Sequence, residues 1–545
     1  MRNKFQMFLS YGIVIVLLLG LCESGYANNF DITNVSLEGR DAIADIVVVE
    51  FDISWDNSWR NGDQHDAVWV FLKVLVNSTA PHVHGDLATA GSNPGDTSKG
   101  SNSDVDIYIP TDRVGALIRR NTNGTGTMSS TNVQLTLDYG GSGIEDTDTI
   151  EVAVIGAEMV YITSGSYYAG DGDTANESTN ALYANGSDNT SVQISSGSVT
   201  ISCDTNADDD IDTTPLTVDG DGGLSGNSSW PTGYDDYYVM KYEISQGQYR
   251  DFLNTLSRTQ QNVRTAADVS GNSISNFYVM SNTSTVSNRQ VVRAPDAGNG
   301  TTAPVVFGCD YASNGSAGNA TFDETGDGEG IAMNYLTWMD LAAYADWAGL
   351  RPMTELEFEK AARGPNNAVY AEYAWGSTTL TQAEGAIQNG GEAGEVANTT
   401  GNGLCNYNGA GTDISGPARC GFAATSSTNR VGGGAGYYGN MELSGNVVER
   451  CVTIGNSTGR AFQGSHGDGM LTTAPGYEGN ASNTDWPGID GTSERGVTGA
   501  AGSGFRGGAW GYTSSYAQVS DRTSAATTDT TRENVYGGRL VRTAP

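Results

Sequence analysis

The chain has 545 residues, and 63 acidic against 28 basic side chains give it a formal net charge of -35. This length exceeds what one hydrophobic core usually fills, so we expect two or more domains. The negative charge repels phosphate backbones and anionic lipid surfaces, which argues against nucleic-acid binding. The carboxylates suit an extracellular calcium-binding protein, and they suit equally a protein that uses them only for solubility.

Residues 1–27 have the pattern of a cleaved export signal. Arg2 and Lys4 precede an apolar run over residues 11–21, and small residues precede a plausible cleavage site after Ala27. The apolar run is too short for a membrane anchor, and no later segment is long and apolar enough to span a bilayer. We therefore predict a secreted or cell-surface protein of bacterial export type.

Residues 28–155 are rich in Val, Ile and aromatic side chains with partial alternation, and turn sequences separate the runs. Regular short strands without a helical window predict a β-sandwich. The strand candidates are 45–55, 67–76, 104–109, 133–139 and 149–156. Trp55, Trp59 and Trp69 are expected to pack in the core and at edges, and a ligand platform is the alternative.

A second unit is predicted over residues 156–545. It begins with a polar Gly/Ser/Thr/Asn/Asp tract at about 171–231, which we interpret as an insertion. Helical periodicity appears at residues 245–256, with Ser245 as a possible N-cap, and at residues 337–349. Glycine-rich loops and short strands fill the rest, so the fold class is α+β with few helices and many loops.

The segment "RPMTELEFEKAARG" predicts a third helix, because Thr354 and Glu357 have the spacing of a capping box. Charge pairs commonly fix geometry in loop-rich cores. The residues expected to form buried ion pairs, with an architectural and not a catalytic role, are Arg351, Glu355, Glu359 and Arg363.

Five cysteines follow the signal segment, at positions 203, 309, 405, 420 and 451. In an oxidising compartment this number predicts two disulfides and one free thiol. Cys405 and Cys420 bracket a glycine-rich loop that a disulfide would close, and Cys203 with Cys309 is the second pairing considered. The four scattered histidines form no convincing zinc site.

The stretch "DTNADDDID" over residues 204–212 places Asp or Asn at alternate positions, as in the first half of a calcium loop. Asp209 stands where glycine would ease the turn, and no acidic residue follows at the closing position. A solvated acidic loop is therefore the alternative to a calcium site.

Seven segments between residues 156 and 545 resemble, in order, those of the formylglycine-generating enzyme family, also called the sulfatase-modifying factor domain. The resemblance implies a variant of the C-type-lectin-like fold, in which sparse secondary structure is fixed by buried polar contacts and calcium. The matching segments are "EMVYITSGSYYAGD", "YYVMKYEISQGQYRDFL", "MNYLTWMDLAAYADWAGLRPMTELEFEKAARG", "YAWG", "ELSGNVVER", "FRGGAW" and "YGGRLVRTAP".

The resemblance also implies calcium sites, and a hard cation prefers carboxylate and carbonyl oxygens on short irregular segments. The family more often has an amide side chain where Glu442 stands. Similarity assigns one ion to the side chains of Glu442 and Glu449 with the carbonyls of Gly445 and Val447, and a second to Asn406 and Tyr407.

Catalytic members of the family carry two cysteines, five residues apart, that bind copper and oxidise a substrate cysteine. In the segment "FRGGAWGYTSSYAQVSDRT" these positions are Tyr512 and Ala517. A phenol and a methyl group cannot replace soft thiolate ligands of Cu(I), so we expect no copper cofactor. The comparison predicts a family member without the redox chemistry.

The leading hypothesis is a secreted, non-catalytic binding or scaffold protein, stabilised by calcium, whose partner is an unidentified protein or glycan. The composition of the former catalytic wall suits adaptable recognition, as in receptors of this scaffold class that are diversified near the C-terminus, and it also suits an ordinary loop. The alternatives are an oxidoreductase acting on sulfatase cysteine and a structural surface or filament subunit that self-assembles on the cell surface. The candidate ligand-binding residues are Trp510, Tyr512, Ser514, Ser515 and Tyr516.

Overall fold

The computed structural model describes residues 29–545 with several gaps. The predicted export signal, the acidic loop 204–212 and Cys203 lie outside the described residues. The internal residues that are not described are 173–180, 185–189, 196–198, 203–215, 219–228, 272–273, 275, 296–302, 312–317, 385–386, 410–413 and 426.

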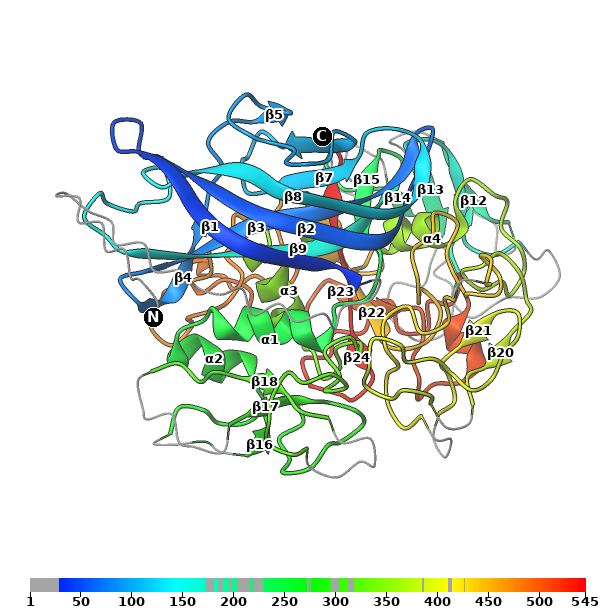
Figure 1. The fold of residues 1–545 in the computed structure, drawn as a ribbon. Helices are drawn as coiled ribbons and strands as arrows, with labels where there is room; N and C mark the ends of the chain where they lie inside the picture. The colour runs from blue at the N-terminus through cyan, green and yellow to red at the C-terminus, as the bar shows by residue number, and fades with distance from the viewer. Residues whose placement is uncertain are drawn as a thin grey trace.

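The N-terminal strands form two layers that pack face to face (Figure 1). In one layer β2 pairs with β1 and β8, and in the other β3 pairs with β9 on one side and with β4 and β7 on the other. The sandwich prediction is therefore confirmed in its strand-rich character. The strands are β1 (Asp31–Asp41), β2 (Ile46–Asn61), β3 (Gln64–Val76), β4 (Thr79–Gly85), β5 (Gly91–Ser92), β6 (Val105–Ile109), β7 (Ala116–Arg120), β8 (Gly124–Asp138) and β9 (Ile150–Ile162).

Strand β3 is buried on both faces. Val68 and Val70 point into the sandwich core, whereas Trp69 and Phe71 point into a second core that they share with the C-terminal unit. The alternation follows from the two-residue period of a strand. Trp55 is fully buried within the sandwich. The two fully buried tryptophans, Trp55 and Trp69, therefore pack in hydrophobic cores, as expected from the sequence.

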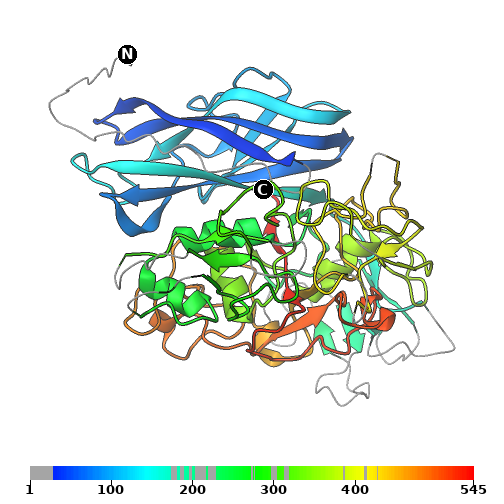
Figure 2. The same ribbon diagram turned by 60° about the horizontal axis from the view of Figure 1, so that its bottom comes forward.

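The central sheet runs from the sandwich into the C-terminal unit without a break. The second half of β9 pairs with β15, which pairs with β25, which in turn pairs with β19. Within the described residues this makes one 12-stranded sheet. The predicted boundary between residues 155 and 156 falls in the middle of β9, and Figure 2 shows the N-terminal layer lying across the C-terminal unit.

The C-terminal unit contains short strands and few helices, as predicted. Its strands are β10 (Tyr167–Ala169), β11 (Tyr183–Ala184), β12 (Val192–Ile194), β13 (Val199–Ser202), β14 (Leu216–Val218), β15 (Tyr237–Met240), β16 (Phe277–Tyr278), β17 (Val292–Ala294), β18 (Gly308–Cys309), β19 (Arg351–Pro352), β20 (Thr381–Gln382), β21 (Leu404–Cys405), β22 (Val448–Val452), β23 (Ser503–Arg506), β24 (Tyr536–Gly537) and β25 (Leu540–Thr543). Its helices are α1 (Gln246–Asn254), α2 (Arg258–Arg264), α3 (Trp338–Trp347), α4 (Glu355–Arg363) and α5 (Ser457–Arg460), with 3-10 turns η3 (Ser493–Arg495) and η4 (Ser514–Ala517).

Capping boxes begin the predicted helices. Ser245 caps α1 and Thr354 caps α4, each with reciprocal side-chain and backbone hydrogen bonds. Such boxes satisfy amide groups that the first helical turn leaves without partners. Helix α2 was not predicted, although Ser257 caps it in the same way. None of the described helices has the length and apolarity needed to cross a membrane.

The tract at about 171–231 is more than a polar insertion. Its described parts include strands β11 to β14, and Leu182 and Ile194 belong to the main core. Apolar side chains at intervals within a polar sequence are thus enough to anchor this segment to the unit.

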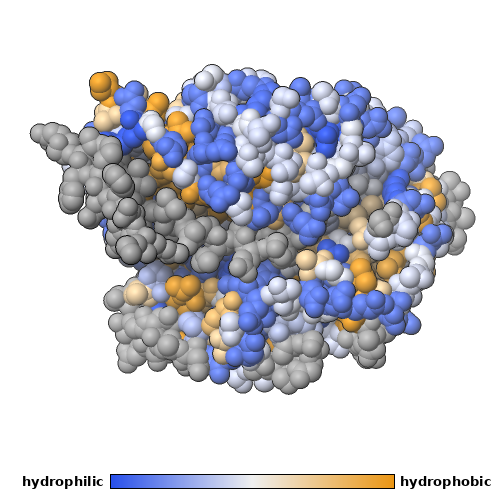
Figure 3. All heavy atoms as spheres, in the orientation of Figure 1, coloured by the Kyte–Doolittle hydropathy of each residue, from blue (hydrophilic) through white to orange (hydrophobic). Residues whose placement is uncertain are grey.

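Buried ion pairs connect helix α4 to later segments. Arg506 donates to Glu355 at 3.0 Å and to Glu359 at 2.7 Å, and Arg363 donates to Glu359 at 3.1 Å. The architectural role predicted for these charges is consistent with their burial. Arg351 pairs instead with Glu357, at 2.6 and 2.9 Å. The face seen in Figure 3 is mostly hydrophilic.

Candidate functional site

The small sheet of β22, β23 and β24 carries the start of residues 505–523, the segment that the resemblance places at the family's catalytic site and that is called the wall below. Strand β23 ends at Arg506, and Gly507 and Gly508 follow with φ of 84° and 67°. A side chain on Gly508 would lie 2.8 Å from the backbone nitrogen of Ala517. Glycine is therefore required here by both conformation and close packing.

The wall is held to its neighbours by backbone contacts. The amide of Trp510 donates to the carbonyl of Asn446 at 2.8 Å, and the carbonyl of Tyr512 accepts from the amide of Asn408 at 2.7 Å. The rings of Tyr512 and Tyr516 lie 5.2 Å apart between centroids. Both rings are half-buried, so they present part of their surface to solvent.

The predicted ligand-binding residues differ in exposure. Ser515 is exposed, and Ser514 is half-buried and hydrogen-bonds to the side chain of Tyr373. Trp510 is 6% exposed, and its indole Nε1 donates to the carbonyl of Asn534 at 3.0 Å. The structure therefore assigns the accessible part of the wall to Tyr512, Tyr516 and the serines, while Trp510 mainly supports it.

The two positions at which the resemblance predicts the family's cysteines, 512 and 517, have different surroundings. Tyr512 lies at the surface, whereas Ala517 is buried and accepts a hydrogen bond from Ser444 Oγ at 2.6 Å. Cys405 Sγ in turn donates to the Ser444 carbonyl at 3.0 Å. A thiol thus lies two contacts behind the wall and does not line it.

The predicted disulfide between Cys405 and Cys420 is wrong in this structure. Both residues are free and buried, and Cys420 Sγ donates to the carbonyl of Glu243 at 3.4 Å. Each thiol has its own carbonyl partner, so no disulfide joins the two ends of the glycine-rich loop. Cys309 is also free, and the pairing with Cys203 involves a residue outside the described part.

The described thiols are poor nucleophiles. Burial raises the pKa of Cys405, and it raises the pKa of Cys309, Cys420 and Cys451 well above the ordinary value. A nucleophilic or copper-binding cysteine requires thiolate character. Each of these four residues is therefore held as the neutral thiol.

The predicted metal residues meet behind the wall. The carbonyl of Asn406 accepts from the amide of Asn446 at 2.8 Å, and the side chain of Asn406 donates to Asn446 Oδ1 at 3.1 Å. A side chain on Gly445, which has a φ of 87°, would lie 2.5 Å from Cys405 Sγ. The residues assigned to two separate calcium sites are thus brought together on adjoining turns. Tyr407, the next residue, is half-buried.

A buried carboxylate cluster lies beneath these turns. Glu243 accepts from the amide of Val447 at 2.9 Å and from Asn446 Nδ2 at 2.5 Å. Glu449 accepts from Arg539 Nε at 2.6 Å, and Glu442 accepts from a backbone amide at 2.9 Å. Sequence reasoning missed Glu243 and Arg539, because their partners lie 90 to 204 positions away in the chain.

Burial dominates the electrostatics of the cluster. It raises the pKa of Glu442 to about 7, and it raises the pKa of Glu243 well above the ordinary value, with further contributions from Glu449 and Glu442. The pKa of Glu449 is also raised by burial, although Arg539 opposes the shift. The cluster therefore binds protons more readily than exposed carboxylates do, and a cation would compete for the same oxygens.

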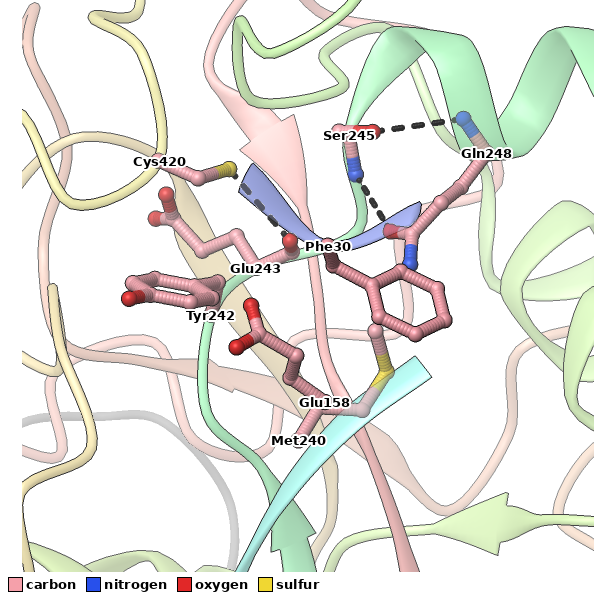
Figure 4. Close-up of a pocket in the computed structure, with 8 residues that line it drawn as sticks. All are labelled: Phe30, Glu158, Met240, Tyr242, Glu243, Ser245, Gln248 and Cys420. Carbon is pink, nitrogen blue, oxygen red and sulfur yellow. Dashed lines mark hydrogen bonds between the residues drawn. The ribbon is translucent and has the colours of Figure 1, made fainter. Parts of the chain in front are cut away.

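A small cavity of about 20 Å³ lies beside the cluster (Figure 4). Glu158, Tyr242, Glu243 and Cys420 line it together with Phe30 from the N-terminal strands. Its volume is about that of one water molecule. The cavity shows that the N-terminal layer closes over this part of the C-terminal unit, and it is too small for an organic substrate.

The predicted calcium ligands fit a cation in chemistry, with one complication. Asn406 Oδ1, Glu442 Oε2 and Glu449 Oε2 are buried without a hydrogen-bond partner. Oxygen atoms of this kind are the donors that calcium prefers. However, Arg539 already occupies the other oxygen of Glu449, and among the described residues no three His, Cys, Asp or Glu side chains converge to hold a metal. An ion here would depend on backbone carbonyls as well.

An arginine that was not singled out from the sequence supports the far side of the wall. Arg450 is fully buried, and its guanidinium lies 4.5 and 4.9 Å from the ring centroids of Phe505 and Tyr536. Its Nη1 donates to the carbonyl of Asp529 at 3.2 Å. The group therefore positions the segment 529–536 against β22 and β23.

Comparison with known families agrees with the arrangement of these segments. The sulfatase-modifying factor enzyme 1-like domain matches residues 151–544, more than half of the chain. No curated protein gave a match to the chain. The match begins within β9 and includes the wall, the turns that carry the predicted metal ligands, and the last strand, β25. The chain therefore belongs to the sulfatase-modifying factor enzyme 1-like family.

Proposed function

We propose that this protein is an exported, non-catalytic binding or scaffold member of its family. One feature supports the proposal: the resemblance to the family places the two copper-binding cysteines at positions 512 and 517, where this chain has Tyr and Ala. Cys405 is linked to Ala517 through Ser444, but its thiol is buried behind Ser444, and burial keeps it protonated. Copper would therefore meet a phenol and a methyl group where the reaction needs two thiolates.

The binding surface of the proposal is the accessible part of the wall. Tyr512 and Tyr516 offer large rings with few rotatable bonds, and Ser514 and Ser515 add adaptable hydrogen-bonding groups. The carbonyl and amide contacts of Asn408 and Asn446 fix the backbone beneath them. A rigid backbone with amphipathic side chains supports recognition of a protein or glycan partner.

We also propose that calcium stabilises the turns behind the wall. The residues that would hold it are Asn406, Glu442 and Glu449, with the carbonyls of Gly445 and Val447. The ion would neutralise part of a buried negative charge that a single arginine, Arg539, now balances most directly. Its role would be structural.

Two assays test the function. Purified protein with Cu(I) and oxygen should leave a cysteine-containing sulfatase peptide unchanged by mass spectrometry, and formation of formylglycine would overturn the non-catalytic assignment. On a mixed glycan and peptide array, the wild type should bind at least one component that Tyr512→Ala and Tyr516→Ala bind at least about tenfold more weakly, a loss of about 1.4 kcal/mol. Equal binding by the variants would remove the wall from the proposal, and filaments under electron microscopy would favour the structural-subunit alternative.

A further inference from the structure

A second, larger cavity lies in the connection between β22 and β23, which precedes the wall segment in the chain. Its volume is about 650 Å³. Small-molecule sites generally have volumes of about 300–1,000 Å³. Residues from the segments 458–468 and 482–489 line it, and most of them are polar.

One side of the cavity is fastened to the other by side-chain hydrogen bonds. The carboxylate of Asp485 accepts from the amides of Gln463 and Ser465, at 3.0 and 3.3 Å, and from the Ser465 hydroxyl. Asn483 Nδ2 donates to the Ser465 hydroxyl at 3.2 Å. Trp486 Nε1 donates to the Ser465 carbonyl at 3.0 Å. The cavity is thus built by cross-linked loops and is not a chance gap between them.

The two segments that line the cavity are tied to the protein core. Asp346, at the end of helix α3, is fully buried and accepts from the amide of Asp468 at 3.1 Å and from the amide of Ser482 at 2.7 Å. Lys73 of β3 donates to the carbonyl of Gly469 at 2.7 Å. Both lining segments are therefore anchored before any ligand arrives, which reduces the entropy that binding must remove.

The lining determines which ligands can bind. None of the described residues that line the cavity is Lys, Arg or His, whereas two of them, Asp468 and Asp485, carry carboxylates. Asn483 Oδ1 is buried and has no hydrogen-bond partner. The carboxylates accept hydrogen bonds and repel anions, and the hydroxyl and amide groups of the other lining residues can donate or accept, so the lining favours a hydroxyl-rich ligand without negative charge.

We propose that this cavity binds a saccharide-sized, hydroxyl-rich ligand that is uncharged or carries an amine. Sugar hydroxyls would donate to the carboxylate of Asp468 and exchange hydrogen bonds with the hydroxyl of Thr484, both on exposed lining residues. The ring of Trp486 is fully buried, so it provides packing and no stacking face. This site is independent of the proposed wall at Tyr512, and its occupancy should not change when the wall is altered.

The test is a titration of the full-length protein with single sugars, in which saturation-transfer NMR measures binding. The sugars are methyl glucoside, galactose, maltose, N-acetylglucosamine and glucosamine. At least one of these should bind saturably, and glucuronate should bind at least about tenfold more weakly than its neutral counterpart, a difference of about 1.4 kcal/mol. Thr484→Trp and Asp468→Asn change exposed residues that line the cavity and should each weaken binding at least about tenfold. Ser493→Trp, on an exposed turn of the same connection, should bind as the wild type does.

Several outcomes would overturn the proposal. One is the absence of saturable binding by every sugar up to about 10 mM, which would mean less than about 3 kcal/mol of binding free energy. Another is binding that Thr484→Trp leaves unchanged, or binding in which glucuronate matches the neutral sugar. Loss of binding in Tyr512→Ala with retention in Thr484→Trp would place the ligand on the wall instead.

Discussion

Replacing Trp69 with alanine should destabilise the sandwich and the C-terminal unit together. Trp69 is fully buried, and its Nε1 donates to the carbonyl of Ala348 at 2.8 Å. The guanidinium of Arg542 lies 4.2 Å from the ring centroid. Truncating a buried tryptophan costs about 3–5 kcal/mol, and leaving a buried carbonyl unpaired costs about 1–3 kcal/mol more. We therefore expect a loss of about 4–8 kcal/mol in the free energy of unfolding.

The assay is differential scanning calorimetry combined with limited proteolysis. Trp69→Ala should move the unfolding of both units to lower temperature, and Trp69→Phe should move it less. Trp55→Ala is the matched control, because Trp55 is equally buried but packs only within the sandwich. If Trp69→Ala shifts a transition of the sandwich and leaves that of the C-terminal unit unchanged, the shared core does not couple the two units and the reasoning fails.

Three further predictions concern pH, thiols and calcium. Burial lowers the pKa of His65 from 6.5 to about 4. Between these pH values the unfolded protein binds a proton at this residue and the folded protein does not, so the free energy of unfolding should fall as the pH drops from 6.5 towards 4. Between pH 7 and 4.5 the wild type should lose about 2–3 kcal/mol more than His65→Gln in urea unfolding, and equal losses would contradict the assignment. Cys405 and Cys420 should react as free thiols after denaturation without reductant, whereas a peptide linking them in mass spectrometry would restore the disulfide. Calcium at about 100 times its Kd should raise the free energy of unfolding by about 3 kcal/mol over that in EDTA; coincident urea midpoints would exclude a structural ion.

Local signals predicted the helices well. The capping patterns at Ser245 and Thr354 gave the starts of α1 and α4, because a box is read from four consecutive residues. Helix α2 carries the same pattern at Ser257, but its sequence "RTQQNVR" lacks an apolar stripe and so gives no periodic signal. The polar helix is held by buried side chains such as Gln261, whose amide donates to two carbonyls.

Long-range features could not be predicted in the same way. Gly156 interrupts the strand pattern in the sequence, yet β9 runs through it. Glycine is needed at this position because a side chain would lie 2.4 Å from the Phe30 ring, which belongs to a distant part of the sequence. The predicted disulfide failed for a related reason, since spacing along the chain does not give the distance between two sulfur atoms. The carboxylate cluster depends on Glu243, whose partner Val447 is 204 positions away.

Strand β25 lies between β15 and β19, which are made from residues 237–240 and 351–352. Neither of those strands can complete its pairing until residues 540–543 have been synthesised. Arg539 and Arg542 flank or belong to this strand and contact segments from far earlier in the chain, near residues 241 and 112. A nascent polypeptide would therefore carry β15 with an open edge, because β25 and the short edge strand β19 can join the sheet only after the last residues have been made. A chaperone that covers this open edge of β15 would protect the protein until its last strand is made.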